Sequence, residues 1–202
     1  HDPNQSAVIG AVSALITVGA IALGVNWYAG RQADAAAVKL EAAQVTFEAK
    51  AYANAAIAFA DTASAYPGTS AGRIALLYRA HALAQQPDPA AAATAYSEYL
   101  ATTPATDYLR QAALIGLAQS SEASGNAAAA TTSYREAAAI AGPFRLTAQV
   151  ALARLEDAAG HAEQAKALYA EIATSPDLDA DTRQALASKL PPRAVDAPAD
   201  AK

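Results

Sequence analysis

The feature that most constrains the fold is an uncharged apolar run from Ala7 to Gly30, whose only strongly polar side chain is Asn26. At a rise of about 1.5 Å per residue, a helix of this length covers a hydrocarbon layer of roughly 30 Å. A helix that is apolar all round needs lipid, or an equally apolar partner surface, on every side. We therefore expect a membrane-spanning or assembly helix over residues 7–30, preceded by a polar segment over residues 1–6.

The large side chains of this expected helix are spread around its circumference. They are Val8, Ile9, Val12, Leu15, Ile16, Val18, Ile21, Leu23, Val25, Trp27 and Tyr28. The aromatic pair at the end of the run suits a membrane interface, because each ring combines an apolar body with a polar group. Small residues also recur four positions apart (Gly10 and Ala14, Ala20 and Gly24), which allows a second helix to approach closely.

The rest of the chain has the composition of a helical domain. About 150 residues remain between the apolar run and the tail, enough for one domain with a core. They are rich in Ala, Leu, Gln and Glu, all good helix formers. A net charge of −5 with scattered cations argues against nucleic-acid binding. The absence of Cys excludes disulfides, thiol nucleophiles and Cys-ligated metals.

A short pattern recurs four times: a small residue, an aromatic four positions later, and then a Pro or Gly. The sets are Ala55, Phe59 and Pro67; Ala92, Tyr96 and Pro104; Ala130, Tyr134 and Gly142-Pro143; Ala165, Tyr169 and Pro176. A helix with its own small residue precedes each set, at Ala43, Ala80, Ala118 and Ala153. The aromatics step by 37, 38 and 35 residues, a period typical of two-helix solenoid repeats. We expect the small and aromatic residues of the second helices to pack one repeat against the next.

These four units resemble tetratricopeptide repeats (TPRs). The second is the clearest, with Leu76, Ala80, Leu83, Ala92, Tyr96 and Leu100 at the positions where the family has large apolar, small and aromatic residues. The resemblance implies an all-α solenoid of about four helix-turn-helix repeats over residues 31–176. The sequence then predicts a capping helix over residues 177–190, and a disordered tail over residues 191–202.

The TPR resemblance also implies a concave groove lined by the first helix of each repeat. The residues in that register are Leu40, Gln44, Phe47, Ile74, Leu77, His81, Ile115, Gln119, Glu122, Val150, Arg154 and Asp157. TPR members that grip a C-terminal carboxylate use Lys, Arg and Asn in such positions, whereas these residues are mainly aliphatic with one Arg. A mixed apolar groove suits a hydrophobic helix or an extended segment of a partner protein.

No arrangement of residues points to catalysis. The three histidines lie far apart in the sequence, and none forms the i, i+4 pair of a zinc site. Acidic residues such as Glu156 and Asp157 read as parts of solvated helix faces, and His81 as a solvated or hydrogen-bonded side chain. We expect no enzyme activity, no cofactor, no metal and no small-molecule substrate.

Two functions remain open. One apolar span followed by TPRs resembles the bacterial inner-membrane family of ancillary Sec translocon subunits. That resemblance implies a membrane-anchored interaction scaffold with its repeats in the periplasm and with envelope proteins or chaperones as partners. The alternative is a structural subunit that binds copies of itself, through the apolar helix and by stacking of repeats, in an extracellular filament.

Overall fold

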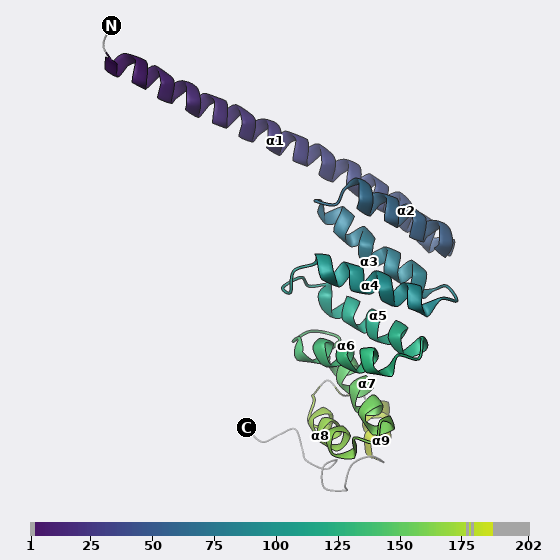
Figure 1. Ribbon diagram of the computed structural model, residues 1–202. Coiled ribbons are helices and arrows are strands. Elements are labelled where there is room, and N and C mark those ends of the chain that lie inside the picture. Colours follow the sequence, from purple (N-terminus) through teal and green to yellow (C-terminus); the bar gives the residue numbers. More distant parts are fainter. Residues whose placement is uncertain (1–2, 177, 179, 188–202) are drawn as a thin grey trace. The chain divides into compact units, whose positions relative to one another are not determined.

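The computed structural model describes residues 3–176, 178 and 180–187; for residues 3–19, 182, 185 and 187 it describes the backbone alone. Every regular element in this part of the chain is a helix, so the all-α prediction is confirmed (Figure 1). The helices are α1 (Pro3–Glu48), α2 (Tyr52–Ala65), α3 (Ser70–Ala84), α4 (Pro89–Thr102), α5 (Arg110–Ala123), α6 (Ala127–Ala139), α7 (Arg145–Ala158), α8 (Ala162–Ala173) and α9 (Ala180–Ala187).

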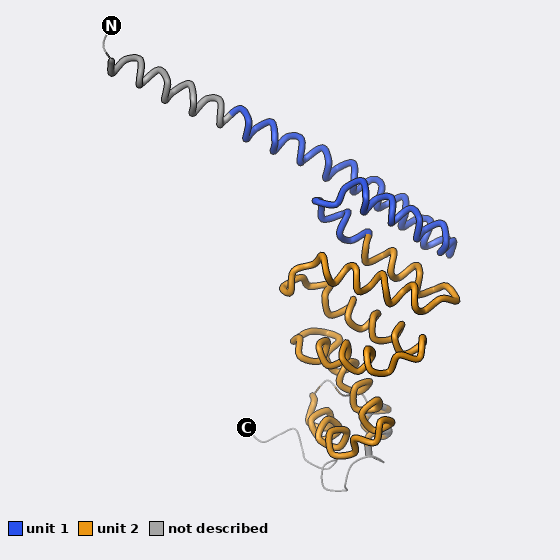
Figure 2. Tube along the Cα trace, in the orientation of Figure 1, with its two compact units in different colours: residues 1–75 blue, residues 76–202 orange. Residues whose placement is uncertain are grey.

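The chain divides into two compact units, residues 1–75 and residues 76–202, with the division inside α3 (Figure 2). In the first unit α2 packs against α1. In the second unit each helix from α4 to α8 packs against the next, and α9 contacts α8. Neighbour-to-neighbour packing of helices joined by short turns is the architecture of an α-solenoid.

Helix α1 is one continuous helix across the segments expected in the N-terminal region. It runs without a break from Pro3 to Glu48, through both expected boundaries, at residues 6–7 and 30–31. Gly30 costs a helix about 1 kcal/mol relative to Ala, which is too little to end a helix that continues in Ala-rich sequence on both sides. The structure shows α9 within the expected capping helix, residues 177–190. The expected disordered tail, residues 191–202, lies outside the described part.

Much of the expected membrane helix also lies outside the described side chains, including Val8, Ile9, Val12, Leu15, Ile16 and Val18. The described members, Ile21, Leu23, Val25, Trp27 and Tyr28, are all exposed. Within the described residues, no helix is long and apolar enough to cross a membrane. The membrane-spanning helix therefore stays a prediction from the sequence.

The turns after α1, α5 and α7 share one hydrogen-bonding pattern. Gly125 and Gly160 have positive φ angles of 80° and 82°. After each, a backbone N–H reaches back to the preceding helix: Asn126 N to Ser121 O at 2.8 Å, and His161 N to Glu156 O at 2.9 Å. This is the Schellman ending, which satisfies the last helical carbonyls. In the first repeat Lys50 occupies the glycine position with φ of 59°.

Side-chain caps start two of the second helices. Asp88 Oδ1 accepts hydrogen bonds from the N–H groups of Ala90 and Ala91, both at 3.1 Å, and Pro89 follows it directly. Asn126 Oδ1 accepts from Ala129 N at 3.1 Å. Such caps pair N–H groups that a helix start leaves open, so local sequence decides where α4 and α6 begin.

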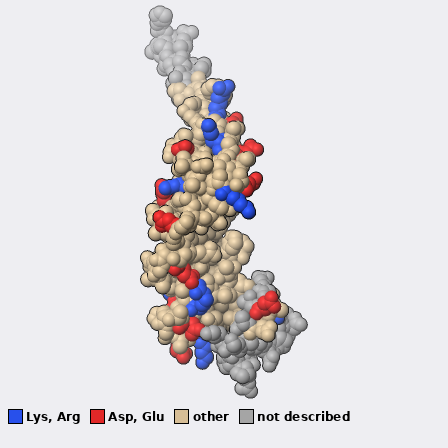
Figure 3. Space-filling model, turned by 90° about the vertical axis from the view of Figure 1, so that its right-hand side faces the viewer, with Lys and Arg blue, Asp and Glu red and all other residues tan. Residues whose placement is uncertain are grey.

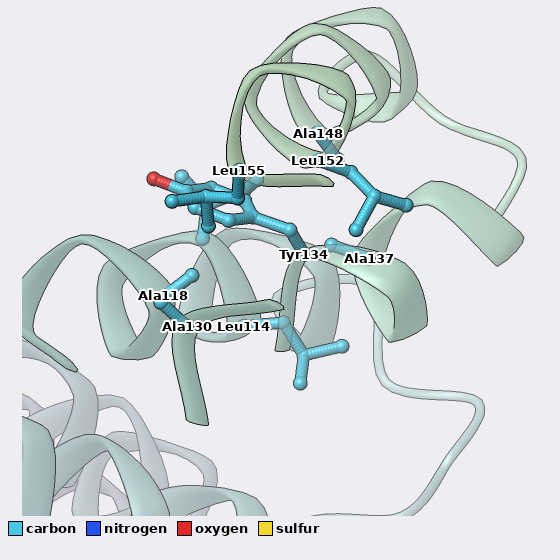
Figure 4. Close-up of a cluster of buried hydrophobic side chains, with 9 residues drawn as sticks. Leu114, Ala118, Ala130, Tyr134, Ala137, Ala148, Leu152 and Leu155 are labelled. Atoms are coloured by element: carbon cyan, nitrogen blue, oxygen red, sulfur yellow. The ribbon is translucent and has the colours of Figure 1, made fainter. Parts of the chain in front are cut away.

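The core of the second unit is a row of clusters, each shared by three successive helices. Leu77, Ala92, Tyr96 and Ala113 belong to a cluster of α3, α4 and α5. Figure 4 shows the next one, where Tyr134 of α6 lies among small and branched side chains of α5 and α7. A third cluster joins α7, α8 and α9 around Tyr169 and Ile172. All eight residues expected to pack the repeats are buried: Ala55, Phe59, Ala92, Tyr96, Ala130, Tyr134, Ala165 and Tyr169.

Candidate functional site

On each of α3, α5 and α7, one polar side chain comes directly after the small, buried alanine of the repeat pattern. His81 follows Ala80, Gln119 follows Ala118, and Arg154 follows Ala153. Gln119 and Arg154 are exposed, and His81 is half-buried. Together with Glu122 and Asp157, these residues are called the candidate face below. It is the polar part of the groove register in the second unit.

The charges of the candidate face are partly neutralised within the molecule. Arg154 Nη2 lies 2.6 Å from Glu122 Oε1 and 2.7 Å from Oε2, so it joins α7 to α5. The hydroxyl of Tyr134 also hydrogen-bonds Glu122, and burial together with this carboxylate raises the pKa of Tyr134. Because the Arg and the Glu neutralise each other, Asp157 is the remaining charged member of the candidate face, whose other side chains offer a partner hydrogen bonds.

His81 lies against aromatic rings. Its ring centroid is 5.8 Å from that of Tyr78 and 5.6 Å from that of Tyr96, both in tilted arrangements. Burial lowers its pKa, since the charged imidazolium would lose hydration there. His81 is therefore a neutral, partly apolar end of the candidate face at pH 7, rather than a fully solvated side chain.

Two predicted groove residues are core residues in the structure. Leu77 and Ile115 are 3% and 8% exposed, and each belongs to a buried cluster. The next helix of the solenoid covers these positions, so the groove is less apolar than the sequence suggests. Val150 is half-buried against the cluster of α7, α8 and α9, and Asp157 is half-buried near the end of α7.

The groove residues predicted for the first unit are half-buried. They are Leu40, Gln44, Phe47 and Ile74. Phe47 packs its ring against Tyr52 at 5.3 Å and Phe59 at 6.3 Å between centroids. Phe47 thus takes part in the packing of α1 on α2.

The prediction that Glu156 belongs to a solvated face is wrong. Its side chain is 8% exposed, and its two oxygens accept hydrogen bonds from Arg135 Nη2 and His161 Nδ1, both at 2.6 Å. These contacts, the His161 bond first, hold the pKa of Glu156 below 4.5. The carboxylate lines a pocket of about 490 Å³ with Thr131 and Leu155, at the junction of α6, α7 and the start of α8. Its partners stand 21 positions before it and five after it, on other elements, so no local sequence pattern signals the cluster.

A second polar cluster was also absent from the sequence predictions. Glu171 of α8 accepts hydrogen bonds from Gln149 Nε2 at 2.7 Å and Arg145 Nη2 at 3.4 Å. These three side chains line a cavity of about 690 Å³ beside Gly142 and Ser175. Since each polar group has a partner, the cluster ties α7 to α8.

The buried polar side chains of the described region are hydrogen-bonded and do not cluster as metal ligands. Among the described residues, no three His, Cys, Asp or Glu side chains gather as metal ligands, and no buried side-chain N or O atom there lacks a hydrogen-bond partner. Acidic and basic side chains are interspersed on the face seen in Figure 3.

Comparison with solved structures addresses the fold. Over 75% of its length, the chain superposes on a crystal structure of the nearly identical TPR-like repeats of a kinesin light chain from Podosopora anserina, covering 83% of that chain with a TM-score of 0.60 and 18% sequence identity. A variant of those repeats with one substitution matches equally well, with a TM-score of 0.60. The chain has a TPR-like fold. At this level of identity the match concerns the architecture alone.

The sequence comparisons add no family to this result. No family model matches the chain, and no curated protein matches it. The TPR-like repeats are thus established by the structure, while the resemblance to ancillary translocon subunits stays a prediction.

Proposed function

We propose that this protein is a non-enzymatic interaction scaffold that holds a segment of another protein along the candidate face. TPR-like folds are typical of such scaffolds. The observation that carries the proposal is the row formed by α3, α5 and α7, which present His81, Gln119 and Arg154 directly after a buried alanine. A partner segment lying across the row meets one such side chain per repeat. The fitting partner is a weakly charged polypeptide, because Arg154 is already paired with Glu122 and Asp157 is the remaining charged member of the face.

A photo-cross-linking side chain at Gln119, in the full chain and in cells, tests this proposal. Thr132, exposed on the second helix α6, is the matched control position. We expect a defined protein adduct from position 119 and none from position 132. We also expect Arg154→Ala to weaken that adduct, because it leaves Glu122 as an unbalanced anion on the face. Equal labelling from both positions, or no adduct from position 119, contradicts the proposal.

The second part of the proposal is that residues 7–30 attach the scaffold to a lipid bilayer. Its support is the uncharged sequence of this run and the exposure of Ile21, Leu23 and Val25. In this proposal the bilayer is a bacterial inner membrane and the repeats lie in the periplasm. Flotation of the full chain with phosphatidylethanolamine–phosphatidylglycerol vesicles is the test. The wild type should float and an Ile16→Asp/Leu23→Asp variant should not; a wild type that stays at the bottom of the gradient refutes the attachment.

A self-assembling filament subunit is the second candidate function. The same uncharged run favours it, since a bundle of such helices is also an apolar environment. Negative-stain microscopy without detergent separates the two. Long regular fibres support the filament, and particles seen only with vesicles or detergent support the anchored scaffold.

A further inference from the structure

Helix α1 carries an exposed stripe with the spacing of a coiled coil. Counting along the helix, the stripe advances by three and four residues in alternation. It consists of Ile21, Gly24, Tyr28, Arg31, Ala35, Val38, Ala42 and Val45, all of them exposed. The large members are 60% exposed at Ile21 and Tyr28, 65% at Val38 and 61% at Val45. At 1.5 Å per residue the stripe is about 36 Å long. This 3–4 alternation is the a and d pattern by which two helices pack as knobs into holes.

The stripe runs beside the other helix packed on α1: Tyr28 and Ala42 line pockets with residues of α2 and of the turn that follows it. The side chains of α1 buried in the first unit include Ala36 and Ala43. At about 100° per residue these lie about 100° or more around the helix from Val38 and Ala42. The large members of the stripe are nevertheless at least 60% exposed, so a second helix can contact them beside α2.

Arg31 is the charged member of the stripe. Its guanidinium lies over the ring of Trp27, 4.7 Å from the centroid. The cation is thus directed toward the edge of the stripe, and Arg31 contributes its methylene groups to the stripe itself.

The flanks of the stripe differ in charge, and this decides what fits on it. With Ala35 and Ala42 at position a, one flank, position g, holds Asp34, Glu41 and Glu48. The opposite flank, position e, holds Lys39 together with Gln32 and Thr46. In a parallel pair the g flank of each helix faces the e flank of the other, whereas in an antiparallel pair g faces g. The three acids therefore disfavour an antiparallel pair, and a parallel second copy supplies Lys39 opposite Asp34.

We propose that residues 21–45 of α1 form a parallel, in-register two-stranded coiled coil with a second copy of this chain. Asp34 of each copy pairs with Lys39 of the other, and Val38 and Val45 of the two copies meet in the seam. The alanines at Ala35 and Ala42 let the two backbones come close. This interface is separate from the candidate face of the second unit and does not depend on it.

Single cysteines test the interface directly, because the chain contains no Cys. The full chain is kept in a mild detergent and oxidised. Val38→Cys should give a disulfide-linked dimer, since residue 38 of one copy meets residue 38 of the other in a parallel, in-register pair. Ala37→Cys, exposed but outside the stripe, is the matched control and should give several-fold less. Equal cross-linking of the two variants, or none from Val38→Cys, overturns the proposal.

Charge exchange tests the partner and the register. Asp34→Lys and Lys39→Asp each place two pairs of like charges across the interface, and each should raise the dissociation constant of the dimer, measured by sedimentation, about fivefold. The double variant restores opposite charges and should recover wild-type association. A monomeric wild type overturns the proposal, and so does a double variant whose dimer is weaker than that of either single variant.

Discussion

The ring of Tyr96 in α4 occupies the space that a side chain at position 116 in α5 would need. A Cβ atom built on Gly116 would lie 2.3 Å from Tyr96 Cζ and 2.7 Å from its hydroxyl oxygen. Tyr96, the aromatic residue of the second repeat, thus packs directly against Gly116 of the third repeat. This contact is where two repeats meet, and it accounts for a glycine in the middle of a helix.

Gly116→Ala should destabilise the protein by about 1–3 kcal/mol, because the Tyr96 ring must leave its buried position. Thermal or urea unfolding followed by circular dichroism measures the loss. Gly30→Ala is the control, since no atom lies within 4 Å of a Cβ at that position, and it should leave the protein equally or more stable. The explanation is wrong if Gly116→Ala is neutral. A Tyr96→Leu/Gly116→Ala double variant should cost less than the sum of the two single changes.

Lys50→Gly should stabilise the protein by about 1 kcal/mol. Lys50 ends α1 with φ of 59°, where the later repeats have Gly125 and Gly160, and a side chain in the left-handed region costs about 1–2 kcal/mol. Part of this gain is offset because glycine gives the unfolded chain more freedom. Urea unfolding is the measurement, and Gly125→Ala should show the opposite sign. A less stable Lys50→Gly variant contradicts this account.

Gln111→Glu should destabilise the protein by about 2 kcal/mol or more. The buried amide of Gln111 donates hydrogen bonds to Ala137 O at 3.1 Å and Ile140 O at 2.8 Å, and its oxygen accepts from Phe144 N at 3.2 Å. A carboxylate there would set an anion against two carbonyl oxygens in a buried site. Gln119→Glu makes the same chemical change at an exposed position and should stay within about 0.5 kcal/mol of the wild type. Equal unfolding midpoints for the two variants would show that Gln111 does not hold the α6–α7 loop.

The Glu156 cluster should make stability depend on pH in the acidic range. Its pKa is lower in the folded protein than its ordinary value of 4.5, chiefly through the His161 bond. The stabilisation is therefore present above about pH 4.5 and is lost as the pH falls through the folded-state pKa. Glu156→Gln should cost about 1–2 kcal/mol at pH 7. The difference in the free energy of unfolding between Glu156→Gln and the wild type should shrink at pH 3.

The exposed Glu136→Gln serves as the reference for this pH series, measured by urea unfolding at each pH. The free energy of unfolding of Glu136→Gln should equal that of the wild type at each pH from 7 to 3. If Glu156→Gln is as far from the wild type at pH 3 as at pH 7, the carboxylate does not act through its charge.

The sequence alone determined that this chain is a helical solenoid, and it located the repeats. Small residues, aromatics and turn residues recur with a fixed period, and the turn and cap residues act through neighbours close to them in the chain. Asp88 and Asn126 start their helices because their side chains reach N–H groups two or three residues on. Such local chemistry can be read from one stretch of sequence at a time.

Only the tertiary structure decided which side chains of each helix remain open to a partner. Leu77, Ile115 and Glu156 are covered by helices that lie elsewhere in the chain, and no local pattern says how far a neighbouring helix extends over them. The stripe on α1 shows the same limit: its 3–4 spacing is present in the sequence, but only the structure shows that its large members stay exposed beside α2. Burial is a property of two surfaces together, so it appears only once both are placed.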